Sequence, residues 1–123
     1  MRVLVAGGVD ALCVLLFVGI GRATHHEEDG VAGYAGTVWP FLVALAAGWL
    51  IGRVWRRPET LAAGAVVWAA TLAGGMALRA ASGDGTAPAF VVVAAVFLAL
   101  TLLGWRAAAR IAAAKGALWG ASK

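Results

Sequence analysis

Four polar residues stand beside or inside long apolar runs of this chain, and their types are the ones that do chemistry. They are Asp10, Arg22, His25 and Arg79. A carboxylate can carry a proton or bind a cation, guanidinium groups bind carboxylates and phosphates, and an imidazole changes charge near neutral pH. We therefore take these four residues as the candidates for a polar site.

Asp10 interrupts the first apolar run eight residues after Arg2, which is roughly 12 Å along a helix. A charged carboxylate near the middle of a bilayer costs about 2.5 kcal/mol or more, so we expect this side chain to face other helices rather than lipid. The candidate partners at a similar depth are the Trp49 N–H, Thr101, Arg53 and Arg106. Two interpretations stay open: a structural link between helices, or a titratable acid that carries protons or cations.

Arg22 and Arg79 each end an apolar run that leads toward the same side of the protein. Cations at the C-terminal ends of helices are favourable in themselves, but two guanidinium groups in one layer would also bind a carboxylate, a phosphate or a lipid head group. The alternative partners are the acidic loop residues 27–29 and Asp84. We expect Gly21 to end the first helix as a left-handed C-cap.

His25 and His26 precede three acidic residues in the most polar segment of the chain. Adjacent histidines in a short loop rarely complete a metal site, so we expect no metal here. We expect His25 to be directed back toward Arg79, with residues 26–30 in water. The simpler alternative is a solvated turn that only connects two helices.

The elements that carry these residues are four apolar runs. Hydrophobic residues make up 63% of the 123 residues and charged residues only 13%, whereas charged residues are about a quarter of a typical soluble domain. Each run is long enough to cross a hydrocarbon core of about 30 Å as a helix. The predicted fold is an all-α membrane protein, a four-transmembrane-helix bundle that forms a single domain over residues 1–123. Its spans are about 3–21, 37–54, 60–79 and 88–106, followed by a short basic tail over 107–123.

The first run is longer than the apolar region of a signal peptide, which has about 7 to 15 residues, and Asp10 interrupts it. We therefore expect the first run to be retained as a span. Small residues recur at four-residue spacing in the second and third runs, which favours close helix packing in lipid. These residues are Ala44, Gly48 and Gly52, then Thr71 and Gly75 with Ala70 and Gly74 beside them.

Basic residues are distributed unevenly between the two ends of the spans. Arg22 and Arg79 fall on one side. The other eight fall on the opposite side: Arg2, Arg53, Arg56, Arg57, Arg106, Arg110, Lys115 and Lys123. Because cytoplasmic loops are enriched in Lys and Arg, both termini are predicted to be cytoplasmic, in the inner membrane of a prokaryote. The net charge of +4 then reflects topology, and the expected partner is the lipid bilayer rather than nucleic acid.

Several segments carry a resemblance to known proteins. They are Asp10 in the first run, FVGIGRATH (17–25), TVWPFLVALAAGWL (37–50), GGMALR (74–79) and LLGWR (102–106). Together they resemble a domain-of-unknown-function family of small four-span integral membrane proteins, mostly from actinobacteria and archaea. The most specific element is a Gly-Arg-x-Ser/Thr-His turn, which corresponds to Gly21, Arg22, Thr24 and His25. The resemblance implies four spans and no established activity.

Two functions remain open from the sequence. The first is a small binding or accessory bundle with an outward-facing Arg/His polar site, assembled with itself or with a membrane-protein partner. The second is a small oligomeric transporter or channel in which Asp10 titrates within the membrane. No catalytic constellation or nucleotide-phosphate motif is found, so we expect neither an enzyme nor a cofactor.

Overall fold

The structure, a computed structural model, describes residues 3–24 and 30–121, and these residues form helices joined by short connections. The elements are α1 (Val3–Thr24), α2 (Gly30–Ile51), the short η1 (Val54–Arg56), α3 (Leu61–Ala81), α4 (Pro88–Leu98), η2 (Ala99–Leu103) and α5 (Gly104–Ala121). Within the described residues, four helices are long and apolar enough to cross a membrane, the last of them formed by α4, η2 and α5 together. The predicted all-α fold with four membrane-length helices is confirmed.

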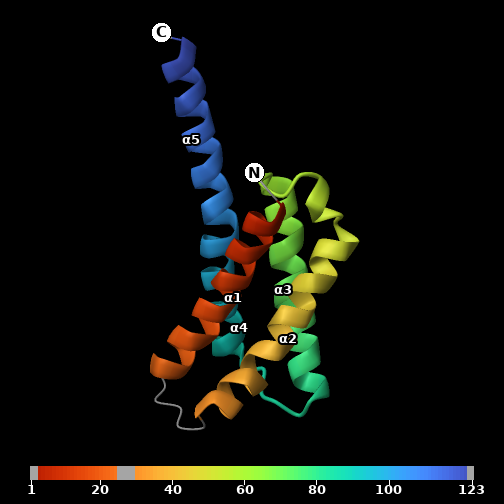
Figure 1. The fold of residues 1–123 in the computed structure, drawn as a ribbon. Coiled ribbons are helices and arrows are strands. Elements are labelled where there is room, and N and C mark those ends of the chain that lie inside the picture. The colour runs from red at the N-terminus through yellow and green to blue at the C-terminus, as the bar shows by residue number, and fades with distance from the viewer. Residues whose placement is uncertain (1–2, 25–29, 122–123) are drawn as a thin grey trace.

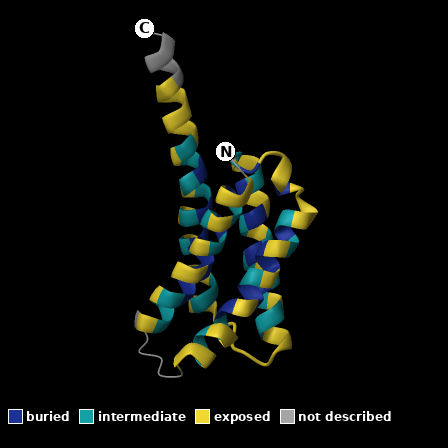
Figure 2. Cartoon of the chain, viewed as in Figure 1, coloured by how far each residue is buried: buried dark blue, intermediate teal, exposed yellow. Residues whose placement is uncertain are grey.

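The four helices pack into one bundle (Figure 1). The connection that contains η1 lies near the beginning of α1, and the connection between α3 and α4 lies at the opposite end. α5 continues the direction of α4 and extends beyond the rest of the bundle. Residues 110–116 of this extension are all exposed (Figure 2).

Helix boundaries follow from local sequence. The Thr60 hydroxyl accepts a hydrogen bond from the Ala63 N–H at 3.1 Å and so caps the beginning of α3. Pro88 lies in the first turn of α4, where its missing N–H has no partner to lose. Gly83, with φ of 82°, follows the end of α3 in the left-handed conformation that glycine adopts easily.

The predicted C-cap at Gly21 is wrong. Gly21 lies inside α1, which continues to Thr24, and it is not among the glycines with positive φ. Arginine and alanine, which follow Gly21, favour helix, so nothing in this segment ends the helix there. At the other side of the connection α2 begins at Gly30, before the predicted start at residue 37. His25 lies outside the described residues.

The contact between α2 and α3 depends on small residues, as the four-residue spacing predicted. A Cβ atom added at Gly48 would lie 2.8 Å from the Ala70 Cβ, and one added at Gly74 would lie 2.9 Å from the Ala44 Cβ. Such distances are closer than side chains tolerate. The two backbones therefore approach each other only because glycine occupies these positions.

Candidate functional site

Polar side chains gather at two places, one toward each end of the bundle. We call the first the Asp10 cluster, formed by Asp10, Trp49, Trp105 and Arg106. We call the second the arginine pocket, a cavity lined by Arg22 and Arg79 together with apolar side chains. Asp10 thus lies apart from Arg22 and Arg79, the other two described candidates named from the sequence.

In the Asp10 cluster, a carboxylate and a guanidinium pair face to face with no exposure to solvent. Arg106 Nη1 donates to Asp10 Oδ1 at 2.8 Å, and Nη2 donates to Oδ2 at 2.7 Å. The Trp105 indole N–H donates to Oδ1 at 2.8 Å, and the Trp49 indole N–H donates to Oδ2 at 2.9 Å. Each carboxylate oxygen therefore accepts two hydrogen bonds, and the charge of Asp10 is matched at close range.

Arg106 also joins the cluster to the chain around it. Its Nε donates to the Pro58 carbonyl at 2.8 Å, and Nη1 donates to the Leu102 carbonyl at 2.9 Å. The guanidinium lies 4.4 Å from the centre of the Trp105 ring. Gly64 of α3 provides the room, since a Cβ atom there would lie 2.6 Å from the Arg106 Cδ. One side chain of α5 thus contacts α1, α3 and the connection before α3.

The wide turn η2 aligns Arg106 with the core. Ala94, Leu98, Leu102 and Arg106 follow one another at four-residue spacing, and all four are 0% exposed. On a regular α-helix, such a series drifts around the axis by about 40° per step. The π-helical turn of η2 has more residues per turn, so it counteracts this drift and keeps Arg106 on the buried face.

Two of the four predicted partners of Asp10 are present in the cluster, namely Trp49 and Arg106. Thr101, another predicted partner, instead donates from its hydroxyl to the Phe97 carbonyl at 2.9 Å, within its own helix. Trp105 was not among the predicted partners, although its position directly before Arg106 in the sequence is a usable signal. The hydrogen bonds of this cluster are typical of a structural link between helices.

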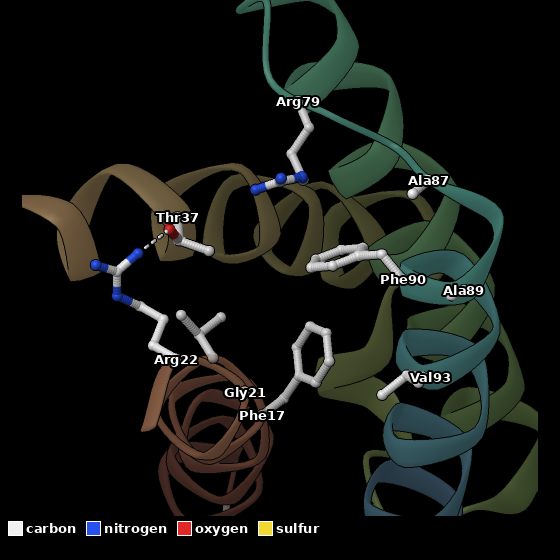
Figure 3. A pocket seen from close by; sticks show the side chains of 10 residues that line it. Phe17, Gly21, Arg22, Thr37, Arg79, Ala87, Ala89, Phe90 and Val93 are labelled. Carbon is white, nitrogen blue, oxygen red and sulfur yellow. Dashed lines mark hydrogen bonds between the residues drawn. The ribbon is translucent and has the colours of Figure 1, made fainter. Parts of the chain in front are cut away.

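The arginine pocket is a cavity of about 430 Å³ beside the end of α3 and the beginning of α4 (Figure 3), at the end of the bundle opposite to η1 (Figure 1). Its lining comes from α1, α2, the end of α3 and the beginning of α4. The residues are Phe17, Val18, Gly21, Arg22, Thr37, Arg79, Ala87, Ala89, Phe90 and Val93. Figure 3 shows the guanidinium groups of Arg22 and Arg79 on either side of Thr37 and the rings of Phe17 and Phe90 toward the cavity.

Each arginine of the pocket donates a hydrogen bond to a neutral oxygen. Arg22 Nη1 donates to the Thr37 hydroxyl at 2.9 Å, and that hydroxyl donates to the Gly33 carbonyl at 3.0 Å. Arg79 Nε donates to the Gly85 carbonyl at 3.0 Å, and its guanidinium lies 4.6 Å from the centre of the Phe90 ring. These contacts position both positive groups at one cavity.

The structure brings together Arg22 and Arg79, which the sequence placed in one layer. Among the residues that the structure describes, no ion pair joins Arg79 to Asp84, and no acidic side chain lines the pocket. The loop acids 27–29 and His25 lie outside the described ranges, so their predicted pairings remain predictions. Thr37 and Phe90 were not identified from the sequence, since a threonine and a phenylalanine within apolar runs carry no distinguishing signal.

Within residues 3–24 and 30–121, no group of three or more His, Cys, Asp or Glu side chains is placed to hold a metal ion. What the fold presents is four membrane-length apolar helices, a fully buried ion pair and a cavity with two guanidinium groups. These features define a multi-pass integral membrane protein.

The chain belongs to the family described as "Protein of unknown function (DUF3054)", whose model matches residues 8–109. The matched region includes all four candidate residues named from the sequence, as well as Arg106. Searches of curated proteins and of solved structures found no match. The resemblance to a domain-of-unknown-function family is confirmed, and the family match itself assigns no activity.

Proposed function

We propose that the protein is a small binding bundle of the cytoplasmic membrane of a prokaryote, which holds a carboxylate or phosphate group in the arginine pocket. The observation that supports this proposal is one cavity of about 430 Å³ lined by two guanidinium groups together with apolar and aromatic side chains. Small-molecule sites commonly have about 300–1,000 Å³, an apolar wall and a few convergent polar groups. Guanidinium groups are well suited to hold the oxygens of carboxylates and phosphates.

In this proposal the pocket faces the outside of the cell. Arg53, Arg56 and Arg57 lie in or beside η1, at the end of the bundle opposite to the pocket, and α5 extends from that same end (Figure 1). An excess of Lys and Arg is typical of the cytoplasmic side of short-loop membrane proteins. The distribution supports cytoplasmic termini and an outward-facing pocket.

The proposal assigns a structural role to Asp10. A proton carrier must exchange its proton with water or with a ligand, whereas Asp10 is 0% exposed and both its oxygens accept bonds from Arg106 and an indole. For this reason we do not propose the transporter in which Asp10 titrates.

The test is a titration of the purified protein, in lipid nanodiscs, with two small water-soluble anions, methyl phosphate and acetate. Charge-assisted hydrogen bonds contribute about 1.5–3 kcal/mol each, so Arg79→Gln is expected to weaken binding at least about tenfold. Arg110→Gln is the matched control, because Arg110 is an exposed arginine of α5 outside the pocket. Binding is measured by ligand NMR line broadening. The proposal is wrong if neither anion binds, or if Arg79→Gln and Arg110→Gln have the same effect.

A further inference from the structure

We infer that the ligand of the arginine pocket is an anionic amphiphile, in which one carboxylate or phosphate is joined to an alkyl or aryl body of about ten carbon atoms. This inference rests on the proposed anion-binding function. The inference goes further by specifying the chemistry of the rest of the ligand, which the guanidinium groups do not contact. Three features of the pocket support it: its volume, its apolar walls and the exposure of one wall.

The volume exceeds what a small anion fills. A water molecule takes up about 30 Å³ of liquid, so a cavity of about 430 Å³ holds about 14 groups of that size. A phosphate group has about five non-hydrogen atoms and would leave roughly two thirds of the space empty. A chain of about ten carbon atoms attached to it would occupy that space.

The walls beside the guanidinium groups are apolar and partly aromatic. Phe17 and Val18 line the cavity although they are only 5% and 3% exposed, so they form its floor. The rings of Phe17 and Phe90 pack with their centres 5.9 Å apart. A hydrocarbon body would remove this surface from water, which a hydrated inorganic anion would not do.

One wall of the cavity also faces the bilayer. Val93 of α4 lines the pocket and is nevertheless 59% exposed, in a helix that is long and apolar enough to cross a membrane. The two guanidinium groups lie near the ends of α1 and α3, where a helix that spans a bilayer reaches the lipid head groups. A molecule dissolved in the bilayer can therefore enter from the side, with its charged group at head-group depth and its body between the helices.

The test compares methyl, hexyl and decyl phosphate on the protein in nanodiscs. Each methylene that becomes buried raises affinity about fourfold, so affinity is expected to rise with chain length and to level off near ten carbons. Partition of the longer chains into lipid also rises with length, so a pair of variants separates the two effects. Val93→Trp fills the pocket, whereas Val92→Trp is its control, because Val92 is 61% exposed and does not line the cavity.

Val93→Trp is expected to weaken decyl phosphate binding at least tenfold while changing methyl phosphate binding less than twofold, and Val92→Trp should change neither. Equal affinity for methyl and decyl phosphate, both lost in Arg79→Gln, would overturn the amphiphile and leave the anion site standing. Equal weakening by the two tryptophan variants would also overturn it. If decyltrimethylammonium binds as tightly as decyl phosphate and Arg79→Gln has no effect, the anion site itself is wrong.

Discussion

The pair formed by Asp10 and Arg106 should dominate the stability of the bundle, and a double-mutant cycle measures its contribution. In Asp10→Leu, the guanidinium stays buried and keeps only its bonds from Nε and Nη1 to backbone carbonyls, so Nη2 loses its acceptor. Removing one partner of a buried ion pair commonly costs about 3–5 kcal/mol. We therefore expect Asp10→Leu to lower the free energy of unfolding by about 3 kcal/mol or more.

The double variant should be less damaging than the sum of its parts. Asp10→Leu with Arg106→Leu leaves no buried charge, and its main polar cost is two indole N–H groups without acceptors, at about 1 kcal/mol each. If each single variant loses about 3 kcal/mol and the double variant about 2 kcal/mol, the coupling energy is about 4 kcal/mol. The double variant should then be at least as stable as either single variant.

The structure also changes the expectation for Asp10→Asn. By shape alone, asparagine should preserve the fold, because its amide resembles a carboxylate. All four groups that contact the Asp10 oxygens are donors, however, so the asparagine NH₂ group must face a donor whichever way it is turned. We therefore expect Asp10→Asn to be destabilising, by about 2 kcal/mol or more.

The assay is reversible unfolding in mixed micelles of increasing SDS content, followed by the far-ultraviolet circular dichroism of the helices. A control cycle pairs Asp10→Leu with Arg110→Leu, whose side chain is exposed on α5, and its coupling should stay within about 0.5 kcal/mol. Strict additivity of Asp10→Leu and Arg106→Leu would refute the reasoning. It would mean that the pair contributes nothing beyond the two separate side chains.

Two further outcomes follow from the helix contacts and the topology. Gly75→Ala should destabilise the bundle by about 1–3 kcal/mol in the same assay, because an added methyl would collide with an aromatic ring of α2, whereas Gly8→Ala has open space and should be neutral or slightly stabilising. In a Cys13→Ser background, an impermeant maleimide added to intact cells should label a cysteine at Gly85 and not one at Arg57, and the reverse labelling would overturn the proposed orientation.

The position of Asp10 was predictable, since the cost of a charge in lipid requires a buried partner. Which of the four candidate side chains pairs with Asp10 was not predictable from the sequence. Thr101 and Arg106 lie on the same predicted helix, and the π-helical turn between them decides which one reaches the carboxylate. The sequence of a hydrophobic span does not reveal a π-helical turn, because apolar residues surround the helix on every side and no polar face marks the change in the number of residues per turn. The sequence also did not determine where α1 ends and where α2 begins, since the residues between these two apolar runs include good helix formers.

The arginine pocket was predictable only in its charged part. Arg22 and Arg79 lie near the ends of two helices that run in the same direction. Their position in one layer could therefore be predicted without knowledge of the tertiary structure. The shape of the cavity depends on how Phe17 and Phe90 pack with Phe41. The centres of these three rings lie 5.5 to 6.2 Å apart. Aromatic packing of this kind follows from tertiary contacts between α1, α2 and α4, and sequence spacing does not encode it.

Charged side chains lie toward both ends of the bundle, and their contacts bear on the proposed function. At one end, a carboxylate of α1 joins a guanidinium of α5 directly. At the other end, Arg22 of α1 and Arg79 of α3 bring two positive groups to one cavity, where the bonds from Arg22 to Thr37 and from Arg79 to Gly85 are to neutral oxygens. Guanidinium groups bind carboxylates and phosphates through charge-assisted hydrogen bonds, and one anion can accept such bonds from more than one arginine. A bound carboxylate or phosphate would therefore link α1 to α3 as Asp10 links α1 to α5, so ligand binding and stabilisation of the outer end are expected to occur together.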